Sequence, residues 1–346
     1  MEELKNRLEA LCIFRSLLKD PIISALLNYL ESPATSAYAE FAAALYNANG
    51  GNISEYVSSI CEDSENVYVR TLGRGEQPQE YLRRALLQEL ETLQEVAELT
   101  CEKLREPLEY KGYLPEIAVS KLDLCEMYLH RAENIGRYGY GIYAKNRMFY
   151  VDEQNGIVPV RNPDSTQLGD LIDYERERQI IIDNTKALLD GKPAANILLT
   201  GDAGTGKSST VKAVTNALWK EGLRIIEIRK DQLRAIPKIL DELSENPLKF
   251  VLFIDDLSFI KDDDSFNALK AVLEGSVTAK SGNVVIYATS NRRHIIKEKF
   301  SEREGDDIHR NDTVQELVSL SERFALERGS RSARLARQFI DGLLSR

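Results

Sequence analysis

The sequence predicts an α/β protein in which a parallel-sheet domain follows a domain made of helices. Three observations predict it: helical periodicity before about residue 140, short apolar runs separated by helices after it, and a glycine-rich loop between one such run and a helix. The 346 residues suffice for about two domains.

Composition narrows the class of protein. The chain has 43% hydrophobic and 29% charged residues, as ordinary soluble globular proteins do, and a net charge of -10 that argues against a general polyanion binder. No apolar run approaches the ~18 residues that span a membrane, and the charged, amphipathic N-terminus is unlike a signal peptide. We therefore expect a cytoplasmic protein without a membrane partner. The cysteines lack CxxC spacing, which predicts reduced structural thiols at Cys12, Cys61, Cys101 and Cys125.

Residues 1–139 are predicted to form a helical N-terminal domain without a chemical motif. Apolar residues recur at spacings of three and four over residues 6–20, 21–31, 80–104 and 114–134.

Residues 140–168 are predicted to be a hairpin and a linker. Aromatic and β-branched residues flank "KNR" and "EQNG", which is typical of a hairpin, and "RNPDSTQLGD" is rich in turn formers. The following stretch, "YERERQIIIDNTKALLDGKP", has the pattern of a helix ended by Gly191 and Pro193.

The later apolar runs predict a parallel sheet. They are nearly continuous rather than alternating, and helices separate them, so the strands are expected to be buried on both faces. The predicted strands are "NILLT" (196–200), "LRIIEIR" (223–229), "KFVLFID" (249–255) and "NVVIYATS" (283–290).

The first of these strands runs into "GDAGTGKSS", which fits the phosphate-loop pattern GxxxxGK[ST]. Glycines let successive backbone N–H groups point at phosphate oxygens, and the following helix aims its positive end at the same anion. Lys207 is expected to reach the β- and γ-phosphates, and Ser208 to hold Mg²⁺. The predicted ATP-binding residues of the loop are Gly201, Asp202, Ala203, Gly204, Thr205, Gly206, Lys207, Ser208 and Ser209.

"KFVLFIDD" supplies the second half of the predicted site. Its apolar run ends in Asp255 and Asp256 at the carboxyl edge of a strand, where ligands of parallel sheets bind. Asp255 is expected to bind Mg²⁺, and Asp256 to orient or deprotonate the attacking water.

Together these motifs resemble the AAA+ ATPases. The resemblance implies that Asn291, after "VVIYATS", senses the γ-phosphate, and that Arg323, in "SLSERF", is an arginine finger for a neighbouring subunit. In "SRSARLARQF", Arg334 resembles a second sensor that acts in cis. From Arg323 onward there are six arginines and two acidic residues, a local +4.

Within AAA+, the sequence is most similar to a bacterial family of ATPases called domain of unknown function 815. "YGYGIYAKNRMFY", "LFIDDLSF", "YATSNRRHII" and "SLSERF" carry that resemblance, which covers about residues 135–340. It implies an ATPase core at 169–324, a remnant lid helix at 325–346, and Ile172 and Tyr174 beside the adenine; a core role explains these two side chains equally well.

The chain departs from the AAA+ pattern in two places. The pattern usually ends its second motif in Asp-Glu, whereas this chain has Asp255-Asp256. Arg323 and Arg334 are only eleven residues apart, too few for a fifth strand and a lid of several helices. With an AAA+ strand order of 5-1-4-3-2, the missing fifth strand leaves "NILLT" as an open edge. The hairpin at 140–151 is our candidate to cover it.

These observations predict Mg-dependent ATP binding and hydrolysis that remodels or loads a macromolecular partner, protein or nucleic acid, with self-association through the arginine finger. The alternative is a nucleotide-dependent switch or scaffold with little turnover, because the lid is abbreviated. The arginine-rich tail could also bind nucleic acid directly, but no aromatic residues alternate with its arginines to stack on bases. A solvated basic face or an acidic neighbour also explains the tail. A third alternative is a small-molecule kinase, but this sequence contains no motif for a phosphate-acceptor site.

Overall fold

The chain divides into two units at residue 145 in the computed structural model, which describes residues 1–257, 259–260, 269, 282–291 and 296–297. The first unit spans Met1–Lys145 and the second starts at Asn146. This boundary falls inside the segment that the sequence predicts to be hairpin and linker.

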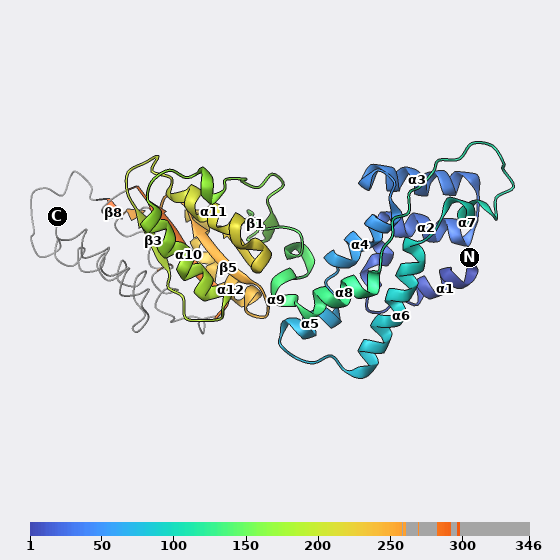
Figure 1. The fold of residues 1–346 in the computed structure, drawn as a ribbon, viewed down its shortest axis with the longest axis horizontal. Helices are drawn as coiled ribbons and strands as arrows, with labels where there is room; N and C mark the ends of the chain where they lie inside the picture. Colours follow the sequence, from blue (N-terminus) through green and yellow to red (C-terminus); the bar gives the residue numbers. More distant parts are fainter. Residues whose placement is uncertain (258, 261–268, 270–281, 292–295, 298–346) are drawn as a thin grey trace, which may run out of the picture. The chain divides into compact units, whose positions relative to one another are not determined.

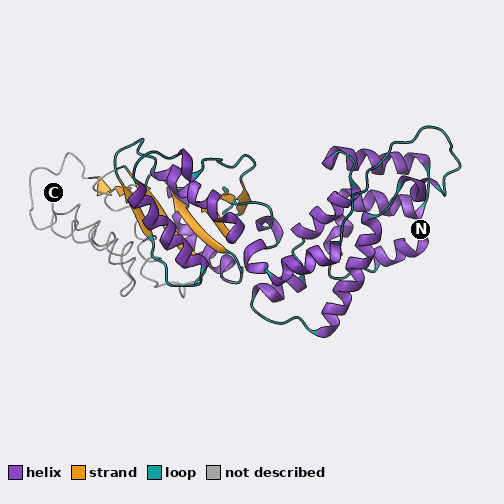
Figure 2. Cartoon of the chain, viewed as in Figure 1, coloured by secondary structure: helices purple, strands orange, loops and turns teal. Residues whose placement is uncertain are grey.

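The first unit is helical (Figure 2). Its α-helices and two 3-10 turns are, in chain order, α1 (Glu2–Glu9), η1 (Arg15–Lys19), α2 (Pro21–Glu31), α3 (Thr35–Asn49), α4 (Ile53–Asp63), α5 (Val67–Gly73), α6 (Glu80–Ala97), α7 (Cys101–Arg105), α8 (Leu124–Glu133), α9 (Ile135–Tyr138) and η2 (Gly141–Tyr143). Apolar side chains at helical spacing make one core, with Leu26, Phe41, Leu45, Leu90 and Leu93 fully buried.

Three stretches with helical periodicity are not helical throughout. A short break at residues 98–100 separates α6 from α7, and the other two breaks are longer. Residues 10–14 leave the helix because the carboxylate of Glu89 on α6 accepts the backbone N–H groups of Cys12, Ile13 and Phe14. Residues 114–123 run extended instead, and Ala118 forms a β-bridge with Asn52 at the start of α4. The hydrogen bonds to Glu89 and the Asn52–Ala118 bridge are both long-range contacts, and they override the local helical periodicity.

The second unit contains a mostly parallel sheet, with order β2-β1-β4-β5-β7-β3 among the described strands. The strands are β1 (Met148–Val151), β2 (Ile157–Pro159), β3 (Ile197–Thr200), β4 (Leu223–Glu227), β5 (Lys249–Ile254) and β7 (Val284–Ser290). β3, β4, β5 and β7 match the four predicted strands, and their order β3-β7-β5-β4 is the 1-4-3-2 part of the predicted order. No fifth strand lies beside β3 among the described residues.

Helices cover this sheet (Figure 1), namely α10 (Glu175–Leu189), α11 (Lys207–Leu218) and α12 (Ile236–Ser244), with 3-10 turns η3 (Leu168–Asp170), η4 (Trp219–Glu221) and η5 (Lys230–Ala235). Ile181 of α10 and Val214 of α11 share a buried cluster with Val251 and Phe253 of β5. A separate two-stranded sheet pairs β6 (Phe259–Ile260) with β8 (Ile296–Lys297). None of the described helices is both long and apolar enough to cross a membrane.

The predicted hairpin exists, but its placement differs from our expectation. β1 and β2 flank a turn at residues 152–156, and β1 pairs in parallel with β4, at the opposite side of the sheet from β3. The side-chain amide of Gln232 in η5 anchors the turn by donating to the carbonyls of Val151 and Asp152. The hypothesis that the hairpin covers "NILLT" is therefore wrong.

Candidate functional site

The glycine-rich loop connects β3 to α11 at the carboxyl edge of the sheet. Gly204 has a φ of 81° and Gly206 a φ of 78°, a left-handed backbone that side-chain-bearing residues rarely adopt. A Cβ at either position would meet no atom within 4 Å, so the backbone angle and not crowding requires glycine. The loop therefore curls ahead of the N-terminus of α11, as an anion-binding loop does.

Lys207, the first residue of α11, folds its ammonium group over the loop. Nζ donates to the carbonyls of Gly201 at 2.8 Å and Asp202 at 2.7 Å. The hydroxyl of Thr205 lies 3.3 Å from Nζ and donates to the Asp202 carbonyl. The loop carbonyls thus hold the Lys207 ammonium group beside the loop, where it can bind an anion in place of the carbonyls.

Ser208 and Asp255 come together across the sheet edge. The Ser208 hydroxyl donates to Oδ1 of Asp255 at 2.6 Å, which leaves the hydroxyl lone pairs available to a cation. Among the described residues, the hydrogen bonds to Asp255 all fall on Oδ1, and Oδ2 accepts none. Asp255 and Ser208 thus form an oxygen pair suited to a hard cation.

Asp256 lies beside this pair in a left-handed backbone conformation, with φ of 51°. Its carboxylate Oδ1 accepts from the side-chain amide of Asn291 at 3.0 Å. Asp256 is exposed, so water can reach its carboxylate. The predicted catalytic carboxylate and γ-phosphate sensor are therefore in direct contact.

Thr289 on β7 is a member of this cluster that the sequence patterns did not single out. Its hydroxyl donates to Asp255 Oδ1 at 2.5 Å and accepts the backbone N–H of Asp256 at 3.0 Å. The only signal in the sequence is a pair of polar residues, Thr289 and Ser290, at the end of a strand whose earlier residues are hydrophobic.

The segment that precedes α10 carries the two predicted adenine contacts. Ile172 is 86% exposed and Tyr174 56% exposed, so neither occupies the core. The guanidinium of Arg178 holds this segment by donating to the carbonyls of Leu168, Leu171 and Asp173. Two exposed apolar side chains on an anchored segment suit a planar ligand, and their role remains a prediction.

Burial and hydrogen bonding fix α10 against β7, the strand that carries Thr289. The hydroxyl of Tyr287 contacts Asn184 Nδ2 at 2.9 Å and Thr185 Oγ1 at 2.8 Å. Burial raises the pKa of Tyr287 to about 12, although both hydrogen bonds lower it. The phenol therefore stays neutral and holds the strand in place.

The chemistry of the cluster fits MgATP. Mg²⁺ prefers oxygen ligands and is usually held by one or two carboxylates together with phosphate oxygens. Among the described residues there is no group of three or more His, Cys, Asp or Glu side chains that could hold a metal alone. A site with Ser208 and Asp255 only is complete when a phosphate supplies further oxygens.

The remaining predicted residues fall into two groups. Asp202 and Ala203 are exposed in the loop, and Ser209 is half-buried in the first turn of α11. Arg323, Arg334 and the abbreviated lid lie outside the described residues.

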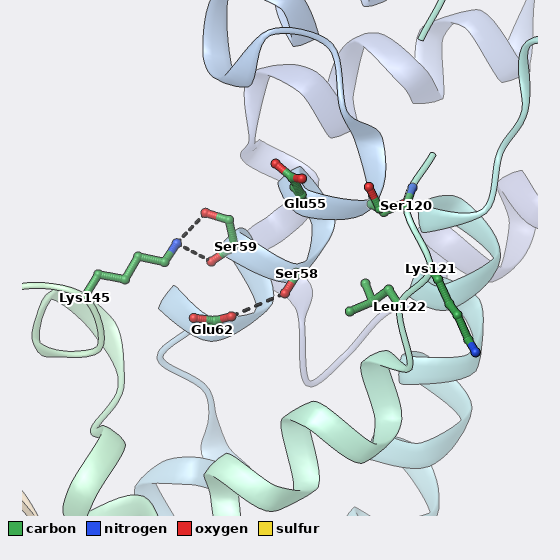
Figure 3. Close-up of a pocket in the computed structure, with 9 residues that line it drawn as sticks. Glu55, Ser58, Ser59, Glu62, Ser120, Lys121, Leu122 and Lys145 are labelled. Carbon is green, nitrogen blue, oxygen red and sulfur yellow. Dashed lines mark hydrogen bonds between the residues drawn. The ribbon is translucent and has the colours of Figure 1, made fainter. Parts of the chain in front are cut away.

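The helical unit has a cleft of its own, of about 220 Å³ (Figure 3). Glu55, Ser59 and Glu62 of α4 line it, and Lys145 reaches the carbonyl of Ser59 at 2.8 Å. None of the predicted site residues lines this cleft.

A left-handed glycine loop between a parallel strand of the sheet and a helix, beside a second strand that ends in acids, defines a P-loop protein with a mostly parallel sheet. Residues 144–327 match the family described as "Protein of unknown function (DUF815)". The match covers more than half of the chain, which therefore belongs to this family.

Solved structures similar to this chain include C. elegans PCH-2, DnaI and AMPPCP-bound DnaA from Aquifex aeolicus. PCH-2 is 20% identical with a TM-score of 0.30, over 46% of this chain and 50% of PCH-2, so the chain spans about half of that protein. DnaI is 18% identical with a TM-score of 0.29, over 50% of this chain and 82% of DnaI. DnaA is 17% identical with a TM-score of 0.28, over 53% of this chain and 66% of DnaA. Likeness at this level says nothing about activity, and no curated protein sequence matches the chain.

Proposed function

We propose that this protein binds MgATP at residues 201–208 and hydrolyses the bond to the γ-phosphate. The observation that carries the proposal is the convergence of Lys207, Ser208 and Asp255 at one sheet edge, with a 2.6 Å contact between the last two. A loop that only bound phosphate would not need the Asp255 carboxylate beside Ser208, since that carboxylate is suited to a metal ion.

Each residue has a defined task in this proposal. The ammonium of Lys207 leaves the loop carbonyls to bind the β- and γ-phosphate oxygens. Ser208 and Asp255 hold the magnesium ion, which when bound neutralises charge on the phosphates. Ile172 and Tyr174 pack beside the adenine.

Asp256 and Asn291 act at the γ-phosphate. Asp256 orients the attacking water and accepts its proton at the carboxylate. Asn291 holds Asp256 through its side-chain amide and senses the γ-phosphate. Arg323 reaches the nucleotide of a neighbouring copy and stabilises negative charge in the transition state, while Arg334 contacts the nucleotide of its own chain.

ATP turnover would drive remodelling or loading of a macromolecular partner in the cytoplasm, with the helical unit selecting that partner. The rival function is a switch that binds ATP and releases it with little turnover. The contact between Asn291 and Asp256 favours this rival in one respect, because it occupies an oxygen of the carboxylate that would receive the proton.

Turnover and binding separate the two functions. Purified wild type is compared with Lys207→Ala and with Lys212→Ala, a control lysine on the same helix that pairs with Glu227 at 3.6 Å. We expect Lys207→Ala to lose at least ~100-fold in kcat/KM and Lys212→Ala to keep wild-type turnover. Tight ATP binding by wild type without turnover above the Lys207→Ala background would establish the switch.

Mixing tests the arginine finger. Arg323→Ala is expected to lose about 1,000-fold in rate and to regain part of it when mixed with Asp256→Asn, because each variant supplies what the other lacks. Full activity of Arg323→Ala alone would remove the finger assignment.

A further inference from the structure

Thr289 occupies a buried position between the two acidic residues of the candidate site. It is 2% exposed, and its hydroxyl is the only side-chain donor to Asp255 Oδ1 besides Ser208 among the described residues. The same hydroxyl accepts the backbone N–H of Asp256. One hydroxyl therefore serves as donor to one residue and as acceptor for the next.

The two contacts restrain different things. The bond to Asp255 fixes the rotation of that carboxylate, so that Oδ1 faces Thr289 and Ser208 while Oδ2 is free of hydrogen bonds from the described residues. The bond from the Asp256 amide holds the peptide group between Asp255 and Asp256, and Asp256 itself has a φ of 51°. A non-glycine residue in that conformation persists only where its surroundings hold it.

The backbone around Thr289 links the same strand to both halves of the site. The Leu257 amide donates to the Thr289 carbonyl at 2.7 Å, and the Gly201 amide donates to the Ser290 carbonyl at 3.3 Å. The end of β7 is thereby bonded to the phosphate loop and to the segment after β5. A change at this strand end reaches both.

We infer that Thr289 is a positioning residue that orients Asp255 toward the metal ion and holds the Asp256 backbone in its left-handed conformation. The inference rests on the proposed function, since it assigns Thr289 a task at the same MgATP site. In this role Thr289 acts through Asp255 and Asp256 and not on the nucleotide or the metal directly.

The test removes the hydroxyl and keeps the shape. Thr289→Val is isosteric, Thr289→Ser keeps the hydroxyl, and Thr215→Val is the matched control. Thr215 is also fully buried in this unit, but among the described residues its hydroxyl bonds only to the Val211 carbonyl within α11. The full chain is used throughout.

The first readout does not require turnover. A fluorescent non-hydrolysable ATP analogue is titrated into each protein with EDTA and then with Mg²⁺, and the ratio of the two Kd values gives the Mg²⁺ enhancement. We expect Thr289→Val to match wild type in EDTA but to lose about 10-fold to 100-fold of the enhancement, as loss of a group that orients a metal ligand does. Thr289→Ser and Thr215→Val should keep it within about threefold.

The second readout separates positioning from general damage. In steady-state turnover, Thr289→Val should lower kcat by at least ~10-fold and change KM less, because Asp256 acts after binding. Melting temperatures report folding, and Thr289→Ala replaces Thr289→Val if the valine variant is not folded. Wild-type Mg²⁺ enhancement in a folded variant without the hydroxyl overturns the inference.

The outcomes distinguish this inference from the proposed function. Loss of Mg²⁺ enhancement in Thr289→Val, in a protein whose wild type has no turnover, supports the role of Thr289 and refutes hydrolysis. Turnover by wild type with unchanged enhancement in Thr289→Val refutes the role of Thr289 alone. Absence of Mg²⁺ enhancement in wild type overturns both.

Discussion

The Glu89→Ala substitution should destabilise the helical unit strongly, although Glu89 is far from the phosphate loop in the sequence. Its side chain is 8% exposed and accepts three backbone N–H groups, from Cys12 at 2.8 Å, Ile13 at 3.0 Å and Phe14 at 2.9 Å. These groups join α1 to η1 and have no helical partner. A carboxylate from α6 therefore replaces the hydrogen bonds of a helical turn.

The magnitude follows from the number and the burial of these bonds. A hydrogen bond to a charged group contributes about 1.5–3 kcal/mol, but Cys12 is exposed and water can replace its bond. We expect Glu89→Ala to lower the free energy of unfolding by about 3–5 kcal/mol. Oε1 accepts two of the bonds and Oε2 the third. Glu89→Gln keeps one acceptor and places an amide donor toward another donor, so about 1–2 kcal/mol is expected.

Native-state hydrogen exchange in the full chain measures this locally, without the assumption that a chain of two units unfolds in one step. Peptides covering residues 10–17 should exchange about 100-fold faster or more in Glu89→Ala, since 1.4 kcal/mol is a factor of ten. Glu91→Ala, an exposed residue of α6, is the control and should change stability by less than about 0.5 kcal/mol. Equal exchange of these peptides in the two variants would refute the reasoning.

Three further predictions concern the unit that begins at Asn146 and the thiols. Asp256→Asn should still bind ATP but lose at least ~100-fold in turnover, because an amide cannot accept the proton. A turnover assay and the binding of an ATP analogue, both measured on this variant, test the prediction. Turnover at the wild-type rate in Asp256→Asn would contradict the role of Asp256 as proton acceptor. Tyr287→Phe should lower stability by about 1–2 kcal/mol at pH 8 through loss of its hydrogen bonds. Because burial raises the pKa of Tyr287 to about 12, the stabilisation is complete below ~10, the value for an unfolded tyrosine, and disappears as the pH rises through the folded value. Urea unfolding at pH 8 and 11 should therefore show a smaller difference between the two proteins at the higher pH, and a constant difference would contradict this. Iodoacetamide should alkylate Cys12 well before Cys61, since Cys12 is exposed whereas burial raises the pKa of the Cys61 thiol; mass spectrometry of native protein checks the order, and equal rates would contradict it.

The four central strands could be predicted because burial on both faces leaves a signal in consecutive residues. "KFVLFID" and "NVVIYATS" are apolar without alternation, and the structure contains β5 and β7 at those positions. The strand order followed from the resemblance rather than from the pattern. Hydrophobic periodicity indicates which side chains are buried, but it does not indicate which strands pair with each other.

The hairpin position could not be predicted for that reason. "MFYV" and "IVP" are short strands that fit any open edge, and in the structure Gln232, some 80 residues later, holds their turn beside β4. Thr289 was missed because threonine is common in strands. Its importance arises only when β5 and β7 place Asp255 and Asp256 around its hydroxyl.

The backbone at Asp256 bears on the departure from the Asp-Glu pattern. A φ of 51° lies in the left-handed region, where aspartate and asparagine are enriched because their short polar side chains bond to nearby groups. Glutamate has no such preference, and its side chain is one methylene longer than that of Asp256, whose carboxylate contacts the amide of Asn291. The shorter residue is therefore matched to this backbone. Together with the Thr289 hydroxyl that holds the Asp256 amide, this match argues that the second aspartate is part of a working arrangement and not a defect in the motif.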